Sequence, residues 1–166
     1  MPRTSSGGAA VLPAPWTPAD AVEFIDAMVA HHQMATEMAE EELARGADGE
    51  VVAMAAQMQE TQAAEVERLL ARRDALTTEP VHALEEDPHA EEALAELASR
   101  SGESLDRAFL VEMIVHHADA VSIAHRAGPN LDDSEVAAIA ETIEDAQAWE
   151  IGQMRQRLDV LEGLVP

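Results

Sequence analysis

The chain has 166 residues, of which 33 are Asp or Glu and 10 are Lys or Arg, and its formal net charge is -23. A surface this acidic repels phosphate backbones, which excludes nucleic acid as a partner and leaves metal ions as the natural attraction. The chain has no cysteine, which excludes disulfides and thiolate metal sites. It also has no apolar stretch of about 20 residues, so we expect no transmembrane segment. The sequence leaves the oligomeric state open.

Residues 1–16 are small, polar and proline-containing, and we predict that they form a flexible N-terminal arm. They lack the basic region and apolar run that mark a signal peptide. Residues 17–166 are rich in Ala, Leu, Glu and Met, which favour helix. Because runs of β-branched or aromatic residues at period two are absent, we predict one all-α domain.

The first predicted helix follows the arm. Thr17 is placed to cap it, and Pro18 suits its first turn. The helix should run to Arg45 and end before Gly46, and a second helix should follow over about 50–75. The remaining predicted elements are a linker over 77–88, a short helix from there to about 102, a helix over about 103–127, and a last helix over about 133–163.

An internal repeat determines the predicted architecture. A shift of 85 residues places the first half on the second without a gap. The matched residues include Phe24 with Phe109, Met28 with Met113, His31-His32 with His116-His117, Gln62 with Gln147, and Glu65 with Glu150. We therefore predict a four-helix bundle of two pseudo-symmetric helical hairpins. Repeat one covers about 17–76, the linker and short helix 77–102, and repeat two about 103–163.

Polar residues occupy the predicted core faces of these helices. At 100° per residue, His32 and His117 lie near the centres of apolar faces, and His31 and His116 lie at the edges. In the partner helices, Gln62, Glu65, Gln147 and Glu150 lie mid-face among apolar residues. Burying a carboxylate without a partner is costly, and the histidines of the preceding helix are the natural partners. Each repeat should therefore contain a buried His–Glu–Gln layer.

This layer has two interpretations. It is either a hydrogen-bonded layer that fixes helix register or a metal site. Imidazole, carboxylate and thioether groups together suit copper, with iron or zinc as alternatives. Met28 and Met113 each lie four residues before a candidate histidine and share its face, although methionine is more often core filler.

The sequence shows no catalytic motif. The di-iron carboxylate pattern needs Glu-x-x-His on long helices, where this chain has none, so a ferritin-type oxidase site is not expected. A nucleophilic triad and a phosphate-binding glycine loop are also missing. We therefore expect no catalytic residues. A metal-dependent redox activity is a weaker alternative.

The His-His motif resembles the signature of the domain-of-unknown-function 305 family. Its first copy reads Phe24-x-x-x-Met28-x-x-His31-His32-Gln33-x-Ala35-x-x-Met38-Ala39. The second copy includes Phe109, Met113 and His116-His117, and Gln147-x-x-Glu150-Ile151-x-x-Met154 is similar to the following-helix motif. The resemblance extends from about Pro18 to Leu161.

The resemblance implies a ferritin-like four-helix bundle, in many members exported or associated with the cell envelope. It also implies that some members bind copper or silver through Met and His, without established enzymatic activity. Carried over to this chain, the candidate ligands are His31, His32, His116, His117, Met28, Met113 and Met38. Ile123 stands where Met38 stands in the first copy, so the second half has fewer soft ligands.

The predicted function is that of a non-catalytic metal-binding protein of the cell envelope, of the copper or silver type. His32 and His117 are the expected main ligands. Glu65 and Glu150 would bind the metal directly or orient the histidines, and Gln62 and Gln147 would complete the hydrogen bonding around them. The alternative function is a structural or protein-interaction bundle whose polar layers are architectural only.

Overall fold

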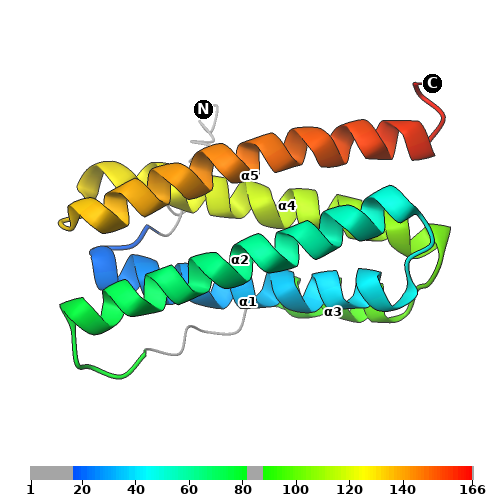
Figure 1. Ribbon diagram of the computed structural model, residues 1–166. Helices are drawn as coiled ribbons and strands as arrows, with labels where there is room; N and C mark the ends of the chain where they lie inside the picture. The colour runs from blue at the N-terminus through cyan, green and yellow to red at the C-terminus, as the bar shows by residue number, and fades with distance from the viewer. Residues whose placement is uncertain (1–16, 82–87, 166) are drawn as a thin grey trace, which may run out of the picture.

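The computed structural model describes residues 17–81 and 88–165, so the predicted N-terminal arm and part of the linker lie outside it. The described residues contain helices and no strand, which confirms the all-α prediction (Figure 1). The elements are α1 (Ala21–Arg45), α2 (Gly49–Leu76), α3 (Pro88–Ala98), α4 (Glu103–Ala127), the short 3-10 helix η1 (Gly128–Asn130) and α5 (Ser134–Leu161).

Two helical hairpins make up the fold. α1 packs along α2, and α4 packs along α5, as the repeat predicts (Figure 1). The hairpins meet mainly through α1 and α4, with further contact between α2 and α5, and α3 packs on α1 and α4. Every helix in the described part of the chain is too short or too polar to span a bilayer.

The start of α1 differs from the prediction. Asp20, not Thr17, is the N-cap, and its carboxylate accepts a hydrogen bond from the Glu23 backbone N–H at 2.9 Å. The Glu23 carboxylate accepts one from the N–H of Ala19, the residue before the cap, at 2.7 Å. The Thr17 hydroxyl instead accepts from Arg126 Nε at 3.3 Å. The glutamate three residues after Asp20 distinguishes the true cap.

The short helix α3 ends at Ala98, earlier than the predicted position near 102. Its end is held by Arg45 at the end of α1, which donates to the Ala98 carbonyl at 2.8 Å and to the Leu97 carbonyl at 3.2 Å. The chain then turns through Gly102, whose φ of 60° favours glycine. The turn uses the residues that were predicted to extend the helix.

Two salt bridges related by the internal repeat connect α2 and α5. Arg72 near the end of α2 donates from Nε to Asp133 Oδ1 at 3.1 Å, and Arg157 near the end of α5 donates to Asp48 Oδ1 at 3.0 Å. Asp133 and Asp48 are also the N-caps of α5 and α2. The hydrogen bond from Arg72 is the main cause that lowers the pKa of Asp133 to about 2. These bridges fix the antiparallel register of the two helices.

The apolar core is divided into two clusters. One contains Phe24, Ile25, Met28, Leu69, Ala120, Ala124, Val136 and Ile143, and the other contains Ala35, Met38, Met58, Leu97, Leu105, Phe109, Met113 and Met154. On each of the four long helices, the His, Gln or Glu residues of the candidate site lie in sequence between the members of the two clusters. The polar layer therefore separates the two halves of the core.

Candidate metal centre

Each repeat contains one buried His–Glu pair, as the sequence predicts. His32 Nε2 lies 2.8 Å from Glu65 Oε2, and His117 Nε2 lies 2.9 Å from Glu150 Oε2. Both histidine side chains are fully buried, whereas the glutamates are 17% and 14% exposed. Because a carboxylate only accepts hydrogen bonds, Nε2 of each ring is the donor, and Nδ1 is the ring nitrogen left for another partner.

The two polar layers merge where α1 meets α4. The rings of His31 and His116 face each other with 3.6 Å between centroids and an interplanar angle of 35°. His31 lies 6.3 Å from His32, and His116 lies 6.4 Å from His117, measured between centroids. The four imidazoles form a row, hereafter the histidine row, which has a Glu at each end.

The central histidines are neutral at pH 7. Burial, followed by the electrostatic effect of His32 and His117, lowers the pKa of His31 to about 3. Burial and the neighbouring histidines also lower the pKa of His116 well below its usual value. Both effects disfavour the imidazolium form. A neutral imidazole is the form that binds a metal ion.

Several buried polar atoms of this centre have no hydrogen-bond partner within the described part of the chain. They are both ring nitrogens of His31, the Nδ1 atoms of His32, His116 and His117, and the side-chain amide atoms of Gln62 and Gln147. Each such atom costs about 1–3 kcal/mol, so a group of them indicates a site for an ion or water. The donor chemistry, neutral imidazole with nearby carboxylate, fits copper or another transition metal.

The arrangement is not a closed coordination shell. Among residues 17–81 and 88–165, no three His, Asp or Glu side chains converge in a way that could hold a metal ion. The unpartnered nitrogens are therefore donors that do not converge on one point. The candidate methionines belong to the apolar core, with Met28 in one cluster and Met38 and Met113 in the other. All three are buried.

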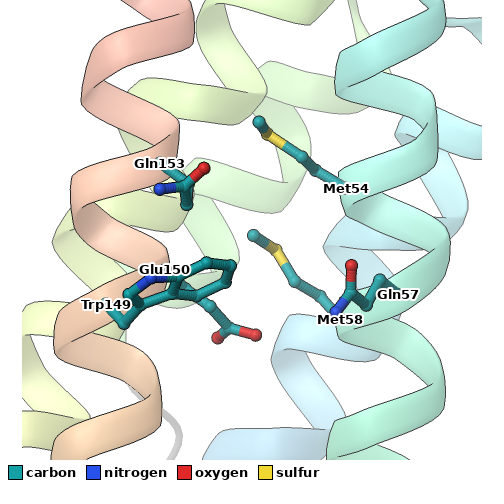
Figure 2. A pocket seen from close by; sticks show the side chains of 6 residues that line it. All are labelled: Met54, Gln57, Met58, Trp149, Glu150 and Gln153. Carbon is teal, nitrogen blue, oxygen red and sulfur yellow. The ribbon is translucent and has the colours of Figure 1, made fainter.

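A pocket that was not predicted from the sequence adjoins the row. It has a volume of about 120 Å³, lies between α2 and α5, and is lined by Met54, Gln57, Met58, Trp149, Glu150 and Gln153 (Figure 2). Glu150 therefore borders the pocket and also contacts His117. The sequence signal that could have indicated this pocket is a difference between the two repeats. The 85-residue shift places Met54 and Met58 on isoleucines.

Comparisons with solved structures place the chain among all-α proteins of one family. A DUF305 fragment from Deinococcus radiodurans is 28% identical, with a TM-score of 0.77 over 87% of this chain and 98% of that chain. CopM in the Cu(I)-bound form is 31% identical, with a TM-score of 0.72 over 82% of this chain and 93% of that chain. CopM in the Cu(II)-bound form is 27% identical, with a TM-score of 0.74 over 88% of this chain and 98% of that chain. CopM has also been solved with silver bound.

No curated protein matches the chain. The family model described as "Domain of unknown function (DUF305)" matches residues 9–73 and 71–158, one match for each repeat. These two matches confirm the resemblance read from the His-His motifs. Since they cover nearly the whole length, the chain belongs to the DUF305 family.

Proposed function

We propose that this protein is a non-catalytic metal-binding protein that holds copper, or silver as its soft analogue, at the histidine row. The observation that carries the proposal is the cluster of four imidazoles with buried, unpartnered nitrogens, of which the central two, His31 and His116, have a lowered pKa. The copper- and silver-bound structures of the related CopM support the choice of metal. Following the family resemblance, we place the protein in the cell envelope or outside the cell.

The residues of the row have distinct proposed roles. His32 and His117 are the main ligands, and His31 and His116 supply further nitrogens across the hairpin interface. Glu65 and Glu150 fix the ring orientations through their hydrogen bonds, which raises the basicity of the imidazoles. Met28, Met38 and Met113 are soft thioethers in the adjacent core. When bound, Cu(I) would be held by nitrogen and sulfur donors, which suit this ion.

A Cu(I) titration under reducing, anaerobic conditions tests the proposal, with a chromophoric chelator as competitor. The double variant His32→Ala/His117→Ala should lose at least one tightly bound equivalent. The matched control is His125→Ala, because this histidine is 73% exposed and also pairs with a carboxylate, that of Glu144. Retention of every equivalent by the folded double variant would refute the proposal.

The second candidate function is a structural or interaction bundle in which the row only sets helix register. The lack of three converging ligands among the described residues favours it. Under this alternative, Glu65→Gln changes the free energy of unfolding, and neither the wild type nor the variant retains copper. Elemental analysis of the purified protein, before and after the titration, separates the two functions.

A further inference from the structure

The pocket between α2 and α5 carries two thioethers and an indole. Met54 and Met58 are one helical turn apart on α2, and their side chains project toward α5, where Trp149, Glu150 and Gln153 face them (Figure 2). Met58 is 4% exposed and Trp149 is 61% exposed. The pocket therefore extends from the edge of the core to the surface.

The internal repeat shows that packing does not require these residue types. The 85-residue shift places Met54 on Ile139, Met58 on Ile143 and Trp149 on Ala64. Ile139 and Ile143 are 2% and 0% exposed and belong to an apolar cluster, so a branched aliphatic side chain fills the equivalent position. Sulfur and indole occur at one of these two repeat-related positions and not at the other, which points to a chemical use there.

Two thioethers select a soft cation. Neutral sulfur binds Cu(I) and Ag(I) well, whereas Mg²⁺ and Ca²⁺ prefer several charged oxygens. Indole is the best aromatic partner for a cation placed over its face. Glu150 adds a negative charge to the pocket wall, and the amides of Gln57 and Gln153 add neutral oxygen atoms. The lining thus supplies soft donors, an aromatic face and one compensating charge.

We propose that this pocket binds one soft monovalent cation, Cu(I) or Ag(I), through the sulfur atoms of Met54 and Met58 with the indole of Trp149 against it. The two sulfur donors lie outside the histidine row, with Glu150 shared between the pocket wall and the row, and binding here does not require copper at the row. The pocket differs from the row also in chemistry, because its main donors are thioethers rather than imidazoles.

Ag(I) titration followed by tryptophan fluorescence tests the site, in chloride-free nitrate buffer. The chain has two tryptophans, so Trp16→Phe leaves Trp149 as the only emitter. We expect a saturable change in Trp149 emission that is complete at about one equivalent bound to the pocket. Met54→Ile/Met58→Ile, which installs the residues of the other repeat, should abolish the change. Unaltered emission on addition of Ag(I), or an unaltered response in this double variant, would overturn the proposal.

Two further variants keep the result interpretable. His31→Ala/His116→Ala should retain the Trp149 response, so failure of the histidine row and failure of the pocket are distinguishable. Trp149→Ala changes an exposed side chain, and it should weaken Ag(I) affinity at the pocket about three- to tenfold, measured by competition. An unchanged Ag(I) affinity in Trp149→Ala would show that the indole takes no part in binding and would overturn that part of the proposal. Circular dichroism melting curves establish that each variant is folded.

Discussion

Glu42 at the end of α1 and Asp106 at the start of α4 bring two carboxyl groups together in the interior, and both residues are 0% exposed. Asp106 accepts hydrogen bonds from the backbone N–H groups of Ala47 and Asp48, at 2.8 and 3.0 Å. A Cβ at Gly46 would collide with the Glu42 carboxyl. Burial, and then the proximity of Asp106, raise the pKa of Glu42 to about 8.

Glu42 should make stability depend on pH. Its folded-state pKa of about 8 exceeds the ordinary value of 4.5, so the unfolded chain releases this proton first. The stabilising contribution is complete below pH 4.5 and is lost as pH rises through 8. Glu42→Gln should abolish this loss and make the protein about 1–3 kcal/mol more stable than wild type at pH 9.

Urea unfolding at pH 5, 7 and 9 measures the effect of Glu42→Gln. The matched control is Glu40→Gln, because Glu40 lies on the same helix and is exposed. The control should follow the wild-type pH profile. A Glu42→Gln profile parallel to that of the wild type would show that Glu42 titrates normally in the folded protein.

The buried ion pair between Asp26 and Arg73 should be a strong determinant of stability. Their side chains are 2% and 4% exposed, and Arg73 also donates to the carbonyls of Glu79 and Pro80, at 2.8 and 2.9 Å. Arg73→Leu leaves the buried Asp26 carboxylate without its guanidinium partner, which should lower the free energy of unfolding by about 3–5 kcal/mol.

The second repeat suggests the compensating variant. The 85-residue shift places Asp26 on Val111 and Arg73 on Leu158, so Asp26→Val/Arg73→Leu installs the apolar residues of the second repeat. The double variant should recover most of the stability lost by Arg73→Leu, as measured in a double-mutant cycle by chemical denaturation. Additive losses would mean that the two side chains are not coupled.

The N-caps of α2 and α5 should contribute more to the free energy of unfolding than the ion pairs that the same aspartates make. Asp133→Ala removes both the α5 N-cap and a partner of Arg72, whereas Arg72→Met leaves the cap and removes the ion pairs of Arg72 with Asp133 and Glu135. We expect a loss of about 1–2 kcal/mol for Asp133→Ala and below about 1 kcal/mol for Arg72→Met. Thermal melts test this order, and the repeat-related variants Asp48→Ala and Arg157→Met should reproduce it. Equal losses of stability in Asp133→Ala and Arg72→Met would show that the ion pair, and not the cap, accounts for the effect.

The contacts within one repeat were predictable because they follow from residue spacing on its two helices. The pairing of His32 with Glu65 follows from helical periodicity together with the cost of an unpaired carboxylate. The contact of His31 with His116 was not predictable, because it depends on how one hairpin is rotated against the other. The ion pair of Asp26 with Arg73 was not predicted, because the second repeat has no such pair and residues common to both repeats do not indicate it.

Replacing the central histidines should separate binding from architecture. His31 and His116 bury unpartnered nitrogens, so His31→Leu/His116→Leu removes a desolvation cost and should stabilise the metal-free protein by about 1 kcal/mol or more. Such a gain is typical of a site kept for binding at the expense of stability. The same variant should bind less Cu(I).

Urea unfolding with a copper chelator present measures the stability of the metal-free variant. The control is His125→Leu, at an exposed position, which should change stability by less than about 0.5 kcal/mol. If the double variant is instead destabilised by several kcal/mol, the histidines hold the two hairpins in register, and the architectural alternative gains the support that the metal-binding proposal loses.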